Sequence, residues 1–251
     1  ITMASVTLSE VRKAYSSMEV IHGIDLEVQS GEFLVLVGPS GCGKSTLAHI
    51  AAGLVDAREG RVARGYARHA MVFQDPCLMP WATAEGNIAF ALKLARWPRH
   101  DRAARVAAAA AMAELEPEDL AKYPVELSGG MRQRVAIARA LAPAPDFIFF
   151  DEPFTALDVA LKRRMQDLVI EAAASARFAA LFITHDLLEA IRISHRILVL
   201  DAGGRGIAGE RLPPGSPGTR DEAAIFALRQ HYLTADPLFA HIHDIDERLR
   251  P

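Results

Sequence analysis

The sequence has little cysteine, no long hydrophobic run and almost no net charge. Two cysteines in 251 residues exclude a disulfide scaffold and favour a reducing compartment, which we take to be the cytoplasm. The longest apolar stretches, such as residues 147–150 and 178–183, have the length of a strand, whereas a membrane-spanning helix needs about 20 apolar residues. The net charge is −3, so no overall field attracts nucleic acid. No basic and then apolar leader opens the sequence, and we therefore expect a globular chain that neither spans a membrane nor binds nucleic acid.

A glycine-rich segment supplies the first chemical signal. Gly38-Pro39-Ser40-Gly41-Cys42-Gly43-Lys44-Ser45-Thr46 matches G-x-x-x-x-G-K-[ST], a loop whose backbone N–H groups cradle phosphates. The segment follows an apolar run at 33–37 and opens an amphipathic helix, which is the context that this motif requires. Lys44 can reach the terminal phosphates, and the Ser45 hydroxyl can bind Mg²⁺. By itself the motif predicts only that the chain binds a nucleotide.

A second candidate anion site lies far downstream, in Leu127-Ser128-Gly129-Gly130. A hydroxyl and bare backbone N–H groups stand there just before a predicted helix, and helix N-termini favour anions. The alternative is an ordinary N-cap serine followed by flexible glycines.

Acidic and imidazole side chains follow two further predicted strands. The apolar run 147–151 ends in Asp151, which can orient Mg²⁺ through its water shell, and the adjacent Glu152 can polarise an attacking water. The alternative is that acidic residues simply end the strand. His185 follows the strand at 180–184, where it could bond a phosphate, although an isolated histidine is usually structural.

Strands alternate with helices along most of the chain, which predicts a parallel sheet covered on both faces. Residues 82–142 have a helical composition, and we expect them to form a helical subdomain inserted into this α/β core. Residues 213–220 have the composition of a linker, and residues 221–251 that of a short helical tail. The strands are expected at 6–11, 24–28, 33–37, 69–73, 147–151, 180–184 and 196–200, and the helices after Lys44 and at 85–96, 102–115, 131–141, 158–174 and 186–193.

These motifs, in this order, resemble the nucleotide-binding subunits of ATP-binding cassette (ABC) transporters. The stretch from Val72 to Trp81 and on to Ile88 is similar to the importer ATPases of the nitrate, sulfonate and taurine group. The resemblance covers about residues 6–200. It implies a P-loop NTPase core with a mainly parallel sheet, an N-terminal antiparallel β-subdomain and the inserted helical subdomain, together forming an ABC ATPase domain over residues 1–212.

The resemblance also implies a site that binds ATP and Mg²⁺ and is completed by a second copy of the chain. Two subunits would stack head to tail, so that Ser128, Gly129 and Gly130 of one close over the ATP held by the loop 38–46 of the other. Asp158 would lie across that interface, and Tyr15 would stack on adenine. The implied catalytic residues are Lys44, Gln74, Glu152 and His185, and the implied Mg²⁺ ligands are Ser45, Gln74 and Asp151.

The implied partners are two transmembrane permease subunits and, indirectly, a solute-binding protein outside the membrane. The chain would then be a peripheral protein on the cytoplasmic face of the inner membrane, powering import of nitrate, sulfonate, taurine or a related small solute. The apolar loop 78–81 is the candidate contact with the permease, and a buried packing loop is the alternative. The competing function is a soluble ABC-type ATPase that acts on a non-transport partner.

The chain departs from the family pattern in two places. Residues 58–69 are shorter and more basic than the hairpin usual there, and the long regulatory domain of some sugar-importer ATPases is not expected. His241, His243, Asp244 and Asp246 could suggest a metal site, but a solvated tail is the favoured interpretation. Four arginines could meet phosphates, although a solvated helical face is favoured; they are Arg96, Arg99, Arg102 and Arg105.

Overall fold

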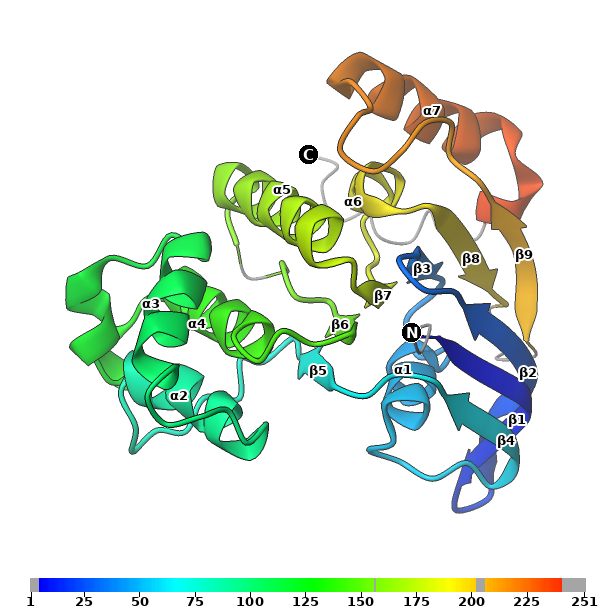
Figure 1. The fold of residues 1–251 in the computed structure, drawn as a ribbon. Coiled ribbons are helices and arrows are strands. Elements are labelled where there is room, and N and C mark those ends of the chain that lie inside the picture. The colour runs from blue at the N-terminus through cyan, green and yellow to red at the C-terminus, as the bar shows by residue number, and fades with distance from the viewer. Residues whose placement is uncertain (1–4, 156, 202–205, 241–251) are drawn as a thin grey trace. The chain divides into compact units, whose positions relative to one another are not determined.

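The structure is a computed structural model that describes residues 5–155, 157–201 and 206–240. It divides into two compact units (Figure 1). The first unit comprises Ile1–Tyr66 and Ala179–Pro251, and the second comprises Ala67–Phe178. The metal-site hypothesis for the histidines and aspartates at 241–246 lies outside the described residues.

An antiparallel sheet opens the first unit. β1 (Val6–Tyr15) lies between β2 (Met18–Val28) and β4 (Glu59–Arg64), and its register with β2 runs from Val6 opposite Val28 to Tyr15 opposite Met18. β1 and β2 are longer than predicted, because a tight hairpin holds their polar ends together where the sequence shows no apolar run. β4 was not predicted, since its residues are mostly exposed and polar.

The parallel strands of the first unit carry its core. β7 (Ala179–Ile183), β3 (Phe33–Val37) and β8 (Arg196–Leu200) are parallel neighbours in that order, and β9 (Ile207–Arg211) pairs antiparallel with β8. β3 and β7 are buried along their whole length, as continuous apolar runs predict. Because β3 and β7 are parallel, the segments that follow them leave the sheet at the same edge.

In the described part of the first unit, three α-helices accompany these strands, and a basic residue of β4 anchors the first of them. The Arg64 guanidinium donates from Nε to the carbonyl of Ala51 at 2.8 Å and from Nη2 to the carbonyl of Ile50 at 2.6 Å. Those carbonyls belong to the last turn of the first helix, where helical partners run out, and the Ile50 carbonyl also accepts from the N–H of the C-cap Gly53 at 3.1 Å. The basic stretch after residue 58 therefore has a structural role at Arg64. The helices are α1 (Lys44–Ala52), α6 (Leu187–Ile193) and α7 (Glu222–Ala235), and the 3₁₀ turn η3 (Pro237–Phe239) follows.

The second unit combines two parallel strands with a helical layer. β5 (His69–Val72) pairs in parallel with β6 (Phe147–Asp151), and β6 is buried throughout. The helices between them fall inside the predicted stretch 82–142, and another follows β6. They are α2 (Ala84–Leu94), α3 (Arg102–Met112), α4 (Gly129–Leu141) and α5 (Val159–Ala176), with 3₁₀ turns η1 (Pro117–Ala121) and η2 (Pro124–Glu126).

The solvated arginine face predicted before and along α3 is wrong for two of its four members. The Arg105 guanidinium lies 3.3 Å from the ring centroid of Trp97 and donates to the carbonyl of Ala142 at 3.1 Å. Arg102 donates to the carbonyl of Trp97 at 2.9 Å. The Trp97 ring packs on the apolar core of α2, α3 and α4, so Arg105 covers an aromatic side chain and Arg102 holds its backbone, instead of both extending into water.

This architecture confirms the predicted fold class: an α/β chain with an antiparallel N-terminal sheet, mainly parallel strands and a helical insertion. In the described part of the chain, the helices are all too short or too polar to traverse a bilayer.

His195 makes the stability of the first unit depend on pH. Its Nδ1 accepts a hydrogen bond from the backbone N–H of Phe33 at 3.0 Å, at the start of the buried strand β3. Burial lowers the pKa of His195, an effect that Glu32 opposes and Arg220 reinforces. The unfolded chain, in which a histidine has a pKa of about 6.5, then takes up a proton at higher pH than the folded chain. We therefore expect the free energy of unfolding to fall as the pH drops below that value.

The measurement is urea unfolding of the unaltered chain and of His195→Gln between pH 7.5 and 5. The variant should show a smaller loss of stability over this interval, because it lacks the titrating imidazole. Equal losses in the two proteins would contradict the assignment.

Candidate functional site

The predicted phosphate loop connects β3 to α1 in the first unit, and its shape depends on glycine at two positions. Gly43 has φ 96°, and a Cβ there would lie 2.6 Å from Cδ1 of Ile21 and 3.0 Å from the carbonyl oxygen of Val20. A Cβ at Gly38 would lie 2.9 Å from Sγ of Cys42. Larger residues at these positions would displace the loop from the neighbouring strands.

Lys44 and the start of α1 form a cationic end to this loop. The Lys44 side chain is only 7% exposed, and its Nζ donates to the carbonyls of Gly38 and Pro39, each at 2.8 Å. No side chain caps the N-terminus of α1, and no acidic residue lies in its first turn. A helix start that no side chain caps, beside an ammonium, is suited to binding an anion such as a phosphate.

His185 lies between two residues that fix its backbone. On one side, the N–H of Thr184 donates to the carbonyl of Leu36 at 3.3 Å, at the end of β3. On the other, Asp186 caps α6 by accepting from the N–H of Leu188 at 2.9 Å, and its own N–H donates to Thr184 Oγ1 at 3.0 Å. His185 therefore emerges at the same edge of the parallel strands as the phosphate loop.

Tyr15 is the exposed aromatic residue at the end of β1. Its side chain is 49% exposed, and the Lys13 ammonium lies 5.2 Å from the ring centroid. Lys13 is paired in register with Ile21, whose side chain also borders Gly43 of the phosphate loop. The hairpin that carries Tyr15 is thus packed against the phosphate loop within the first unit.

In the second unit, two carboxylates stand at the end of β6. Asp151 is 8% exposed and ends the buried strand, and Glu152 follows it in a left-handed conformation with φ 47°. The hydroxyl of Thr155 lies 3.1 Å from the carbonyl oxygen of Glu152 and 3.4 Å from Oε2 of the same residue. Left-handed non-glycine residues are strained and cluster at functional sites. The turn thus places a polar side chain directly after a buried strand.

Two of the four residues that the resemblance assigns to a dimer interface, Ser128 and Asp158, are helix N-caps. Ser128 Oγ accepts from the N–H of Met131 at 3.2 Å at the start of α4, and Asp158 Oδ1 accepts from the N–H of Leu161 at 2.9 Å at the start of α5. A Cβ on Gly130 would lie 3.0 Å from Leu161, so glycine lets α4 and α5 approach each other closely. The Ser128 cap leaves the predicted anion site untested, because a hydroxyl that accepts a hydrogen bond still has a proton that it can donate to an anion.

Gln74 is exposed just after β5, and two residues that sequence analysis missed hold the chain around it. Gln133 of α4 donates to the carbonyl of Phe73 at 3.2 Å. Arg139 of the same helix donates to the carbonyls of Pro76 at 2.7 Å and Cys77 at 2.8 Å. Their positions on α4 do not distinguish them from other polar residues of a helix, so the sequence carries no signal of these contacts.

The apolar loop after Gln74 is partly packed and partly exposed. Leu78 packs on the core of the helical layer, whereas Trp81 is 77% exposed. Asn87 is fully buried and holds this loop by accepting from the N–H of Met79 at 2.8 Å and donating to the carbonyl of Ala82 at 3.1 Å. The loop therefore displays Trp81 from a fixed backbone.

The predicted site residues are divided between the units. The phosphate loop, Tyr15 and His185 lie in the first, whereas Gln74, the 128–130 segment, Asp151, Glu152 and Asp158 lie in the second. Ser45 is thus in a different unit from the other two predicted Mg²⁺ ligands, and the set of three remains a prediction. Within the described residues, no group of three or more histidine, cysteine or acidic side chains could hold a metal ion.

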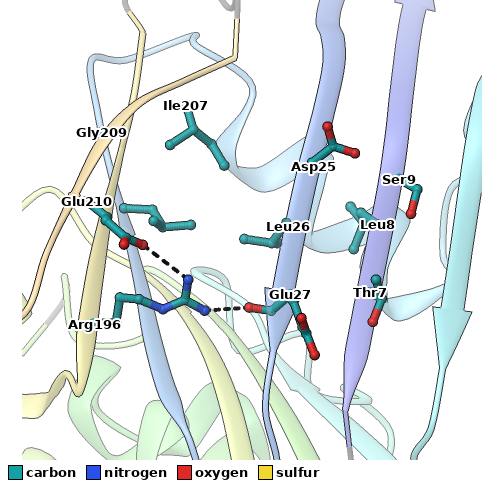
Figure 2. Close-up of a pocket in the computed structure, with 11 residues that line it drawn as sticks. Thr7, Leu8, Ser9, Asp25, Leu26, Glu27, Arg196, Ile207, Gly209 and Glu210 are labelled. Carbon is teal, nitrogen blue, oxygen red and sulfur yellow. Dashed lines mark hydrogen bonds and ion pairs between the residues drawn. The ribbon is translucent and has the colours of Figure 1, made fainter.

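A groove of about 420 Å³ in the first unit lies between the antiparallel sheet and β8 with β9 (Figure 2). Arg196 crosses one end, donating to the carbonyl of Glu27 at 2.5 Å and pairing with Glu210 at 3.3 Å. The lining residues include none of the predicted site residues. Arg196 therefore links β8 to β2 and β9, which stabilises the support of the site.

Comparison with known proteins gives a family match over the central part of the chain. The family described as ABC transporter matches residues 21–155. This stretch contains the phosphate loop, the Ser128 segment and the acidic pair after β6.

Two curated relatives are named as import ATP-binding proteins. The sn-glycerol-3-phosphate import ATP-binding protein UgpC of Cereibacter sphaeroides is 41% identical over 211 residues, or 80% of this chain. The chain spans 60% of the length of that relative. The aliphatic sulfonates import ATP-binding protein SsuB 1 of Pseudomonas syringae pv. syringae is 42% identical over 226 residues, covering 88% of this chain and 92% of the relative.

Solved structures share the fold. The dimeric structure of MJ0796, a bacterial ABC transporter cassette, matches with a TM-score of 0.77 and 30% identity over 84% of this chain and 99% of that one. A structure of the same cassette in a post-hydrolysis state, bound to ADP and Pi, matches with a TM-score of 0.76.

Proposed function

Because this chain belongs to the ABC transporter family, we propose that it is an ATP-hydrolysing subunit that powers a membrane importer. The observation that carries the proposal is the phosphate loop, in which a left-handed Gly43 precedes the buried Lys44 at an uncapped helix N-terminus. This geometry is suited to a polyphosphate. The names of the relatives, which are import ATP-binding proteins, support the same function.

In this proposal the first unit holds the nucleotide. Lys44 exchanges its bonds to the carbonyls of Gly38 and Pro39 for bonds to the terminal phosphates, and the first N–H groups of α1 bind the same oxygens. Tyr15 offers an exposed ring on which adenine stacks. His185, fixed between Thr184 and the α6 cap, donates a hydrogen bond to the γ-phosphate.

Hydrolysis is assigned to the polar residues that follow β6 and β5. Glu152 accepts a proton from the attacking water, and Gln74 positions that water through its amide. Ser45, Gln74 and Asp151 would hold Mg²⁺ with hydroxyl, amide and carboxylate oxygens, the donors that this ion prefers, and the ion would offset phosphate charge.

We further propose that two copies of the chain share each ATP. The Ser128 hydroxyl accepts from Met131, so its proton remains available to a γ-phosphate of the other copy. Gly129 places no side chain beside the Ser128 hydroxyl, and Asp158 caps a neighbouring helix in the same unit. The dimeric form of the MJ0796 cassette supports this arrangement.

The proposed partners are two transmembrane permease subunits on the cytoplasmic face of the inner membrane, served by a solute-binding protein. Trp81, displayed at 77% exposure on a backbone held by Asn87, is suited to contact an apolar segment of a permease. A solute of the sulfonate, nitrate or taurine group is favoured, because the sulfonate relative aligns over more of this chain than the glycerol-phosphate relative.

The test is phosphate release by the purified chain with ATP and Mg²⁺. We expect release that stops when the ion is chelated, since the phosphate charge is then uncompensated. The chain should also co-purify from detergent with a multi-span permease encoded beside it, which distinguishes an importer from a soluble ABC-type ATPase. Absence of release at any ATP concentration would contradict the ATPase assignment. Phosphate release by a chain that never co-purifies with a permease would favour the soluble alternative.

A further inference from the structure

The C-terminal segment 213–239 is fastened to the helix that follows His185. In Figure 1, α7 lies beside α6 at one end of the first unit. Ile225 and Tyr232 are the buried residues of α7, at 4% and 5% exposure, and the Tyr232 ring stacks on Phe239 at a centroid distance of 4.6 Å. The C-terminal segment is therefore packed against the rest of the first unit.

Arg220 forms the central connection. Its guanidinium donates only to backbone carbonyls: to Ile191 at 2.6 Å and Arg192 at 3.4 Å in α6, and to Pro213 at 3.0 Å, Pro214 at 2.7 Å and Gly215 at 2.6 Å in the linker. The α6 carbonyls are in its last turn, where a helix leaves acceptors without partners. Burial lowers the pKa of Arg220. A cation placed there satisfies and orients the end of α6.

A second contact joins α6 directly to α7. Arg192 of α6 pairs with Glu222, in the first turn of α7, at 2.6 Å. The far end of α7 is held elsewhere, because Arg211 of β9 forms two hydrogen bonds of 2.6 Å with the carboxylate of Asp236. The segment is thus held to α6 by Arg220 and by the Arg192–Glu222 pair, and independently to β9 by Arg211.

α6 connects Arg220 to His185. The helix has seven residues, so it is about 10 Å long and a single rigid body. Its N-cap, Asp186, directly follows His185, and Arg220 holds its last turn. Any tilt of α6 therefore moves the backbone that carries His185.

We propose that Arg220 is a positioning residue for ATP hydrolysis, which fixes His185 by holding the end of α6 against the linker 213–215. This inference rests on the proposed function. It gives the C-terminal segment a part in catalysis, beyond stabilising the fold. Arg220 itself touches neither substrate nor reacting atoms.

The test compares Arg220→Gln with Arg211→Gln in Mg²⁺–ATP hydrolysis, each below its own unfolding transition. Arg220→Gln should lower kcat about tenfold and change KM for ATP less than twofold, because displaced catalytic groups lose rate while the phosphate loop and Tyr15 are untouched. Arg211→Gln is the matched control, because it also loosens the segment but at β9. It should lower the unfolding temperature and leave kcat within twofold.

A double-mutant cycle excludes a merely structural effect. In a His185→Ala background, Arg220→Gln should change the residual rate less than twofold, since the group that it positions is gone. Arg220→Lys is a second variant in case Arg220→Gln does not fold. Lysine keeps the charge but cannot bond the carbonyls of α6 and of the linker together, so this variant should also lower kcat.

Equal kcat losses in the Arg220 and Arg211 variants, an unchanged kcat in both Arg220 variants, or full additivity with His185→Ala would overturn the positioning role and leave the proposed function intact. No hydrolysis by the unaltered chain would overturn both.

Discussion

Glu152→Gln should reduce ATP hydrolysis about 100-fold or more while leaving ATP binding intact. The substitution removes the carboxylate that accepts a proton from water, and a general base contributes about 10²- to 10⁴-fold to a rate. Gln is nearly isosteric, so the left-handed turn at φ 47° and its contact with Thr155 are retained. The measurement is phosphate release together with equilibrium binding of labelled ATP.

Glu171→Gln is the matched control, because Glu171 is an exposed acid on α5 of the same unit. It should hydrolyse ATP at the rate of the unaltered chain. Undiminished phosphate release by Glu152→Gln would show that Glu152 is not the general base. Loss of ATP binding in that variant would show that the substitution acts on binding and not on the chemical step.

Gly43→Ala should weaken ATP binding about 100-fold. The new Cβ would lie 2.6 Å from Cδ1 of Ile21 and 3.0 Å from the backbone oxygen of Val20, and the backbone oxygen cannot move without shifting β2. The loop must therefore move away from the sheet, and with it the N–H groups that hold phosphates. The left-handed φ of 96° adds about 1–2 kcal/mol of strain.

Gly31→Ala separates strain from displacement of the loop. Gly31 has φ 75°, but a Cβ there meets nothing within 4 Å. This control should lower the free energy of unfolding by about 1 kcal/mol and leave ATP affinity unchanged. Calorimetric titration with ATP measures both affinities. An affinity for Gly43→Ala within threefold of the unaltered chain would contradict the role given to this loop.

The sequence predicted buried elements well and exposed ones poorly. β3, β6 and β8 begin and end at the predicted residues. A short apolar run bounded by polar residues is the pattern of a strand that is buried on both faces of a sheet, so the ends of the run mark the ends of the strand. β4 and β9 were missed. Both depend on pairing with a longer neighbour, and neither has a buried residue that a pattern could reveal.

Hydrogen bonds from side chains to backbone carbonyls also could not be predicted from the sequence. Arg64, Arg139 and Arg220 each hold a helix end or a loop through carbonyls, and nothing in the sequence distinguishes such an arginine from a solvated one. The partners are backbone groups brought close by the fold, so residue spacing carries no signal of them.

Within the candidate site, some residues could likewise be predicted from the sequence pattern and others could not. The spacing of the phosphate loop predicted nucleotide binding from the sequence alone. In the structure a Cβ at Gly43 would collide with β2 and Lys44 is buried against loop carbonyls, and its contact with phosphates stays a prediction. Tyr15, Gln74 and Asp158 were named only through the resemblance to a family. Their roles depend on a nucleotide and on a second chain, and these roles stay predictions.

The most direct test of the account is the mass of the Glu152→Gln variant in solution with saturating ATP and Mg²⁺, measured by light scattering. Two chains enclosing ATP should raise the mass from the 27.3 kDa of one chain to twice that value, and removal of the nucleotide should reverse the change. A mass that stays at 27.3 kDa while ATP is bound would contradict the shared site.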